Sequence, residues 1–178
     1  MNHTTSGQLV VPLSKTKLIL LISGAVGFVA LGVWLWSIAE YQTRYNPLYM
    51  KAVAVTSAGF FGVCGIYGFA KLFDTAPGLI IDSEGIVDNS SGVSAGRIPW
   101  REIRGITVTS LKGQKFLTFE VENPQKYVER GNFLKRQLNA VNLKYFGSPI
   151  QIAANSLQIR FDELHKIVVE FHDRYKGA

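Results

Sequence analysis

Two apolar stretches decide the fold: LILLISGAVGFVALGVWLWSIA, residues 18–39, and AVAVTSAGFFGVCGIYGFA, residues 52–70. Neither stretch contains Lys, Arg, Asp, Glu or His. As α-helices they would be roughly 33 and 28 Å long, against a hydrocarbon core of about 30 Å. The sequence therefore predicts a transmembrane helical hairpin over residues 18–71, after an N-terminal arm (residues 1–17) and before a folded domain (residues 77–178).

The basic residues are distributed in a way that fits a membrane edge better than nucleic acid. The chain has a net charge of +6, but 14 of its 19 Lys and Arg and 12 of its 13 Asp and Glu lie from Leu72 to Ala178. That part is therefore only slightly basic, and most of the excess flanks the apolar stretches. A nucleic-acid-binding protein more often has a basic stripe on its folded domain. We expect a membrane as a partner and no nucleic acid.

The same flanking residues indicate an orientation. Lys15 and Lys17 precede the first stretch and Lys71 follows the second, whereas the connecting turn holds Arg44 and Lys51. The positive-inside rule then places both ends of the hairpin in the cytoplasm. The first stretch is longer than a usual signal-peptide core, and no Ala-x-Ala-like site closes it, so we expect an uncleaved anchor. The N-terminal arm is expected to be loose, with Leu9–Leu13 touching the headgroups.

Aromatic and small residues of the hairpin predict its membrane-interface anchors and its helix-packing positions. Aromatic side chains near span ends are expected to anchor in the membrane interface; they are Trp34, Trp36, Tyr41, Tyr45 and Tyr67. Small residues spaced four apart let helix backbones approach closely in lipid; they are Ser23, Gly27, Ala54, Ala58 and Gly62. These small residues either pack the two spans against each other or form a homo-oligomer interface.

The segment Asp74–Gly78 interrupts the helix. After it, the pattern of apolar residues changes from that of helices to that of short strands. Short strands are predicted at Leu79–Ile81 and Ile86–Val87 around a turn at residues 82–85, and at Gly96–Trp100. Longer strands are expected at Ile103–Val108 and Phe116–Val121 around Lys112–Gly113. A last strand at Pro149–Ala153 is expected to pair with Leu157–Arg160. Together these predict an antiparallel meander.

Helices are predicted between and after these strands. Asn123 and Pro124 suit a helix start, Gly131–Asn132 a break, and Gly147 an end. Apolar residues of this middle region are predicted to share one face; they are Tyr127, Leu134, Leu138, Val141 and Tyr145. Residues 162–176 form a clear amphipathic pattern with acidic residues at the start and basic residues at the end.

The C-terminal part resembles bacterial pleckstrin-homology-like (PH-like) domains. The residues that carry the resemblance are Leu79–Asp82, Gly85–Ile86 and Gly96-x-Ile98-Pro99-Trp100-x-x-Ile103. Asn123-Pro124-x-x-Tyr127 and Gly147-Ser148-Pro149-Ile150-x-Ile152 are similar to a family of small bacterial proteins with two membrane spans before such a domain. The resemblance implies an α+β fold with a membrane part, a bacterial inner-membrane location and no transferable activity. The first turn, Asp82–Gly85, is acidic, so lipid-binding residues of eukaryotic PH domains are not carried over.

No catalytic motif or metal-ligand pattern stands out. His165 and His172 share a side of the last helix, but the single Cys64 lies inside a span, so helix-surface charge explains their surroundings better than a metal site. Neither Gly-x-Ser-x-Gly nor a phosphate-binding glycine loop occurs. Basic residues on the middle helices are the best candidates for lipid-headgroup contacts; they are Lys126, Arg130, Lys135 and Arg136.

The sequence thus predicts a cofactor-free, non-enzymatic interaction or scaffold module on the cytoplasmic face of the membrane, with an unidentified protein partner. An edge strand or the last helix would dock that partner. The first alternative is a lipid or envelope-stress sensor that lies on the membrane, and the second is an enzyme or a subunit of one.

Overall fold

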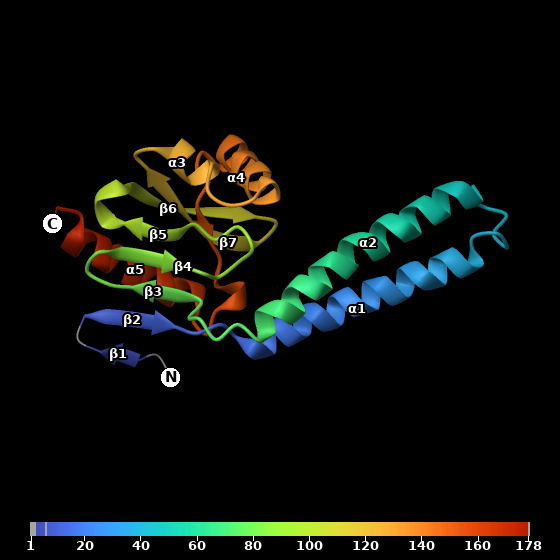
Figure 1. Ribbon diagram of the computed structural model, residues 1–178, viewed down its shortest axis with the longest axis horizontal. Helices are drawn as coiled ribbons and strands as arrows, with labels where there is room; N and C mark the ends of the chain where they lie inside the picture. Colours follow the sequence, from blue (N-terminus) through green and yellow to red (C-terminus); the bar gives the residue numbers. More distant parts are fainter. Residues whose placement is uncertain (1–2, 6, 178) are drawn as a thin grey trace. The chain divides into compact units, whose positions relative to one another are not determined.

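The computed structural model describes residues 3–5 and 7–177. The chain divides into two compact units (Figure 1). Residues 15–75 form the first unit, the helical hairpin. The second unit, called the sheet domain below, combines the residues up to Ser14 with those from Ala76 onward.

The hairpin consists of α1 (Lys15–Ile38) and α2 (Pro47–Leu72), which run antiparallel side by side (Figure 1). Asn46 caps α2 because its side chain accepts a hydrogen bond from the Leu48 amide, and Pro47 occupies the first turn. Both predicted apolar stretches are confirmed as helices. Each is long and apolar enough to cross a membrane.

The first sheet of the sheet domain is an antiparallel meander of five strands in chain order. Its strands are β1 (His3–Thr5), β2 (Gln8–Val11), β3 (Leu79–Ile81), β4 (Gly85–Asp88) and β5 (Gly96–Pro99). The predicted turn between β3 and β4 is confirmed: the Asp82 carboxylate accepts hydrogen bonds from the amides of Glu84 and Gly85. Gly85 is required there, since a Cβ would lie 2.1 Å from the Ile98 carbonyl oxygen of β5.

The second sheet has three antiparallel strands in the order β6-β7-β8. They are β6 (Ile103–Leu111), β7 (Gln114–Val121) and β8 (Gln151–Ile152). The predicted Lys112–Gly113 turn joins β6 and β7 with φ values of 48° and 83°, the left-handed conformation of a tight hairpin turn. A 3₁₀ turn, η1 (Trp100–Glu102), connects the two sheets.

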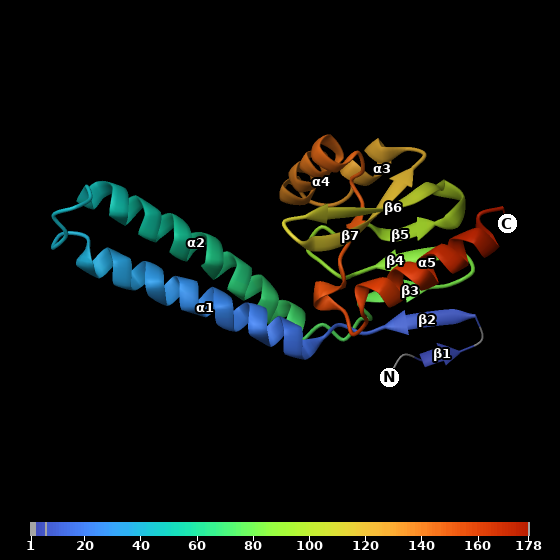
Figure 2. The same ribbon diagram turned by 180° about the vertical axis from the view of Figure 1, so that it is seen from behind.

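Three helices complete the sheet domain: α3 (Pro124–Val128), α4 (Phe133–Phe146) and α5 (Phe161–Tyr175). The predicted helix start at Asn123, break at Gly131–Asn132 and end at Gly147 are all confirmed. α5 lies against the strands of the first sheet (Figure 2), where Leu164 and Val168 are fully buried. Beside α5, the Trp100 ring fills the core and its indole N–H donates to the Asp82 carbonyl at 2.8 Å.

The prediction of a loose N-terminal arm is wrong. β2 pairs with β3, with Val11 opposite Leu79 and Leu9 opposite Ile81. Leu9, Val11 and Leu13 are buried in the sheet domain, so they are not placed to touch headgroups as expected. Their alternation is that of a strand with one buried face, but its pairing partner follows the hairpin in the sequence. The helical hairpin is therefore inserted between two neighbouring strands of one sheet.

One other pairing differs from expectation. β8 pairs with β7 and not with Leu157–Arg160. The residues in between form a 3₁₀ turn, η2 (Ala154–Ser156), and Leu157 makes a β-bridge with Leu13 instead. The competing partner is again the N-terminal segment, which the local sequence pattern does not indicate.

Candidate interaction surface

An apolar stripe on α4 is the most unusual surface of the sheet domain. It consists of Leu134, Leu138, Val141 and Tyr145, whose exposed fractions run from 44% to 72%. These residues are spaced i, i+4, i+7 and i+11, so they follow one side of the helix. The sequence predicts this shared face, but it also places Tyr127 on it, and Tyr127 is buried. The remaining four residues, called the α4 stripe below, lie uncovered in this structure.

The opposite side of α4 holds the helix against the domain. Asn139 is buried and its side-chain amide donates to the Tyr127 carbonyl at 3.2 Å, while Leu143 and Phe146 are half-buried. The helix is well terminated, because the Asn132 side chain accepts from the Lys135 amide at 3.0 Å and Gly147 ends it in the left-handed conformation. The α4 stripe is thus presented by a fixed element.

Every charged residue of α4 is basic: the helix carries Lys135, Arg136 and Lys144. Burial raises the pKa of the Asp88 carboxyl, and the positive charge of Lys135 partly opposes this shift. The Arg136 Nε donates to the Gly131 carbonyl at 3.1 Å on the exposed surface, and the Lys144 Nζ lies 5.9 Å from the centroid of the Tyr145 ring. Lys144 therefore flanks the α4 stripe, a position that the sequence interpretation did not single out.

The other two predicted headgroup contacts, Lys126 of α3 and Arg130 after it, contact other residues of the sheet domain. The Lys126 ammonium lies 2.6 Å from the Glu102 carboxylate, and the Tyr127 hydroxyl donates to the same carboxylate at 2.8 Å. Lys126 is the main reason that the pKa of Glu102 lies below its usual value, whereas burial, and then the Glu102 carboxylate, raise the pKa of Tyr127. Arg130 lies 4.2 Å from the Tyr127 ring centroid and donates to the carbonyl of Ala95. Lys126 and Arg130 thus fix α3 to the sheet.

The loop between β4 and β5 contacts both α4 and the segment that connects the hairpin to β3. Asp88 is buried and accepts hydrogen bonds from both the amide and the hydroxyl of Ser90 and from the Ala95 amide, while burial raises its pKa. The next residue, Asn89, donates its amide to the Gly78 carbonyl at 2.9 Å. The loop therefore spans from the α3–α4 region to the residues that follow the hairpin.

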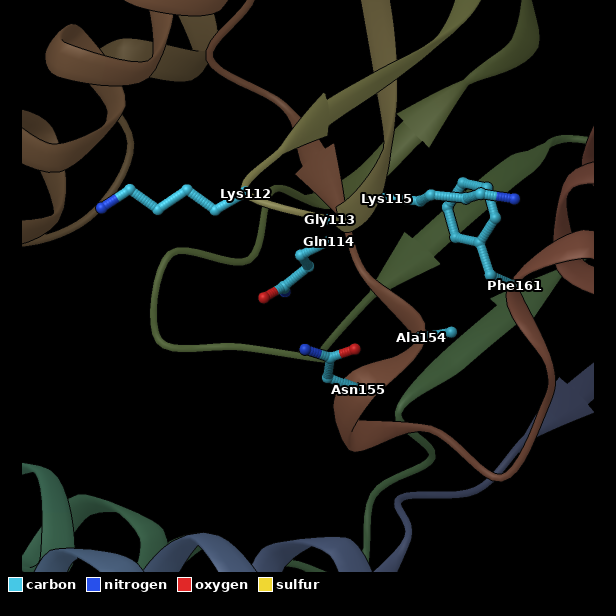
Figure 3. A pocket seen from close by; sticks show the side chains of 7 residues that line it. All are labelled: Lys112, Gly113, Gln114, Lys115, Ala154, Asn155 and Phe161. Carbon is cyan, nitrogen blue, oxygen red and sulfur yellow. The ribbon is translucent and has the colours of Figure 1, made fainter.

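A pocket of about 500 Å³ lies between the β6–β7 turn and η2 (Figure 3). Gln114 and Asn155 face each other across it, and Lys112 points away from it (Figure 3). The Lys115 ammonium is held 3.2 Å from Asp162 and 5.6 Å from the centroid of the Phe161 ring. Amide groups at this open surface can hydrogen-bond a small polar group. The pocket had no sequence signal, because its parts lie some forty residues apart.

This pocket borders the segment that enters α1. The Ser14 amide donates to the Ser156 carbonyl at 2.7 Å, and the Gln158 amide donates to the Pro12 carbonyl at 3.0 Å. Ser156 Oγ also donates to the Ser90 carbonyl at 2.7 Å. Both points at which the sheet domain connects to the hairpin therefore lie beside η2 and the β4–β5 loop, and this region is called the anchor edge below.

In the hairpin, all five predicted interface anchors are exposed on the helices or the connecting turn; they are Trp34, Trp36, Tyr41, Tyr45 and Tyr67. At the turn, the Lys51 ammonium lies 2.6 Å from Glu40 and 5.3 Å from the centroid of the Trp36 ring. This ion pair fastens the start of α2 to the end of α1.

The predicted helix-packing residues divide between two surfaces. Ala54 and Ala58 contact Gly32, where an added Cβ would lie 3.0 Å from the Ala54 carbonyl oxygen. Gly62 lines an apolar groove between the two helices. Ser23 and Gly27 are exposed on α1 and do not take part in this close approach.

The two histidines of α5 have separate surroundings. The His172 ring nitrogen lies 3.2 Å from the Ile103 carbonyl oxygen, and the His165 ring stacks on Phe161. Within residues 3–5 and 7–177, no group of three His, Cys, Asp or Glu side chains is arranged to hold a metal ion.

Comparison of the chain with protein-family models, with curated proteins and with solved structures finds no match.

Proposed function

We propose that this protein is a membrane-anchored binding module, in which the hairpin spans the bacterial inner membrane twice and the sheet domain, of PH-like fold, presents the α4 stripe to a partner. The length and apolar composition of α1 and α2 support the membrane assignment. The exposed Trp and Tyr residues near the helix ends support it as well. The function is recognition and not catalysis.

The pairing of β2 with β3 supports a two-span topology. These strands precede and follow the hairpin, and they belong to one sheet. A sheet cannot form across a bilayer, so both ends of the hairpin lie on the same side of the membrane. The basic residues Lys15, Lys17 and Lys71 favour the cytoplasmic side.

The PH-like assignment rests on strand arrangement. β2 to β5 form a four-stranded meander, which β1 extends, and β6 to β8 form a three-stranded sheet. α5 closes the domain after the last strand. This order resembles the four-plus-three strands and C-terminal helix of PH-like domains. The resemblance supports a binding role only by analogy, because a fold does not determine a function.

The observation that carries the proposal is the α4 stripe. Leu134, Leu138 and their two neighbours leave a continuous apolar surface exposed on a helix whose other side is packed. Contiguous exposed apolar side chains of this kind mark sites of interaction with proteins or membranes. In the sheet domain, α4 is the helix that combines a fixed position with an uncovered apolar face.

Photo-crosslinking in intact membranes tests the proposal. A photoreactive phenylalanine derivative would replace Leu138 in the full chain, and a matched variant would carry it at Lys166, an exposed position of α5. We expect adducts with lipid or protein at position 138, at a yield several-fold above that at position 166. Equal yields at the two positions would contradict the proposal.

A further inference from the structure

We propose that the α4 stripe is seated in the anionic headgroup layer of the same membrane that holds the hairpin, so that α4 is an interfacial helix. The inference rests on the proposed function, since it names the partner of the surface described there. Its ligand class is a lipid surface bearing negatively charged phosphate headgroups.

The charges of α4 favour an anionic surface over a second copy of the chain. The helix carries three basic residues and no Asp or Glu among its 14 residues. Packing two such helices stripe to stripe would bring two basic surfaces together with no acidic residue of α4 to pair with them, which is unfavourable at short range. By contrast, α5 carries both signs of charge on its exposed positions. Lys144, exposed beside the α4 stripe, complements lipid phosphates.

The composition of the stripe matches that of helices that lie in a membrane interface. Such helices bury an apolar face at the boundary of headgroups and acyl chains and keep basic residues at the polar border. In α4, Leu134, Leu138 and Val141 form the apolar middle, and Tyr145 adds an amphipathic ring at one end. The aliphatic stem of Lys144 can extend along this face while its charge stays at headgroup depth.

The attachment of the sheet domain keeps a membrane within reach. α1 begins at Lys15, directly after Ser14, and only residues 73–78 separate α2 from β3. Six extended residues span at most about 20 Å. Because the tether is so short, the membrane surface is present at a high effective concentration around the sheet domain. Even a weak contact between α4 and the headgroups would then be populated.

Contacts inside the sheet domain relate α4 to the anchor edge. Lys135 of α4 interacts electrostatically with Asp88, which binds the amides of Ser90 and Ala95 in the β4–β5 loop. That loop is joined to Gly78 through the amide of Asn89. The first turn of α4 therefore connects through one loop to the residues that leave the hairpin.

The test uses the full chain in lipid nanodiscs that hold one copy each. In a Cys64→Ser background, an environment-sensitive fluorophore is attached at Leu138→Cys, and the matched control carries it at Lys166→Cys on α5. Disc lipids are either zwitterionic phosphatidylcholine alone or a mixture with phosphatidylglycerol, and a fraction carries a quencher at the upper acyl chain. Emission wavelength and quenching report whether each label is in water or lipid.

We expect the label at position 138 to shift to shorter wavelength and to be quenched in the anionic discs, whereas the label at position 166 stays exposed to water. Lys144→Gln should reduce the ratio of lipid-seated to water-exposed label about fivefold, from one lost charge contact. High salt should weaken seating in the same direction.

Other outcomes would overturn the inference. A label at position 138 that remains in water in both lipid mixtures overturns the inference. So does shielding that requires two copies per disc, which would identify a second chain as the occupant. If these discs show no seating while crosslinking at position 138 yields a protein adduct, the proposed function stands and the inference alone fails. If neither experiment gives a signal, both fail.

Discussion

Glu102 shows how much of the sheet domain depends on a single carboxylate. It lies in the turn between the two sheets and accepts hydrogen bonds from the Lys126 ammonium and the Tyr127 hydroxyl of α3. The Glu102 side chain is only 16% exposed, so solvent screens these contacts less than those of a surface pair. α3 in turn supports α4 through the hydrogen bond from Asn139 to the Tyr127 carbonyl.

Replacing Glu102 with Gln should lower the free energy of unfolding by about 1–2 kcal/mol at pH 7. The pKa of Glu102 is lowered in the folded protein from its ordinary 4.5, chiefly by Lys126. The carboxylate therefore stabilises the fold above pH 4.5, and this contribution is lost as the pH falls through the lowered pKa. The deficit of the variant should thus shrink in acid. Denaturant unfolding of the full chain in detergent at several pH values, followed by Trp100 fluorescence with Trp34 and Trp36 replaced by Phe, measures this deficit.

Glu122→Gln is the matched control for this substitution. Glu122 pairs with Arg104 at 3.2 Å, but both side chains are about two-thirds exposed. A pair this exposed contributes under about 0.5 kcal/mol, so the control should unfold almost as the unaltered chain does. Equal losses for the two variants would contradict the role assigned to Glu102.

At the scale of elements, α4 and α5 have similar amphipathic patterns in the sequence but opposite environments in the structure. Leu164 and Val168 of α5 are fully buried, whereas Leu138 and Val141 of α4 are nearly half exposed. Periodicity predicts that a helix has an apolar face, but what covers that face depends on distant residues. The sequence therefore predicted both helices and could not tell the core face from the uncovered one.

Two alanine substitutions would distinguish the buried face of α5 from the exposed face of α4. Leu164→Ala removes buried methyl groups and should destabilise the sheet domain by about 2–5 kcal/mol. Leu138→Ala removes the same atoms from an exposed position and should change the stability by less than about 0.5 kcal/mol in detergent. Unfolding of each full-length variant with Trp34 and Trp36 replaced by Phe, monitored by circular dichroism and Trp100 fluorescence, gives both values. A large loss for Leu138→Ala would mean that the stripe belongs to the core.

The sequence also indicates most of the candidate basic residues, but not the residues that they contact in the fold. Lys126 lies on α3 as predicted, whereas Arg130 lies in the bend between α3 and α4, and their hydrogen bonds go to Glu102 and Ala95 far back in the chain. Arg136 is exposed but lies two residues from both Leu134 and Leu138, on the side of α4 away from the stripe, whereas Lys144 lies beside the stripe. Such pairings are set by tertiary contacts, which residue spacing along one helix does not encode.

At the scale of the whole molecule, the sheet domain is discontinuous in sequence. β2 precedes α1, and its partner β3 follows α2. Apolar run length is enough to predict the hairpin, whereas the alternation of Leu9, Val11 and Leu13 is too short by itself to indicate a strand. The missing information was the pairing partner, which lies beyond both helices.

Deleting residues 1–14 should destabilise the sheet domain although it leaves α1 and α2 intact. The deletion removes Val11, which is fully buried, and exposes the edge of β3 together with the surface that Leu9 and Leu13 cover. We expect rapid tryptic cleavage within residues 76–178 in membranes. A control that deletes only residues 1–7, which keeps β2, should resist cleavage much better. Equal resistance of both deletions and the full chain would contradict the pairing.

If the hairpin spans the membrane as proposed, its insertion between β2 and β3 has a consequence for biosynthesis. β2 is synthesised before both helices, and its partner β3 is synthesised after them. β2 therefore stays unpaired until β3 emerges from the ribosome. If one helix fails to integrate, the two strands end on opposite sides of the bilayer and the sheet cannot close. Completion of the sheet domain would then act as a check on membrane insertion, leaving misinserted chains unfolded and open to proteolytic removal.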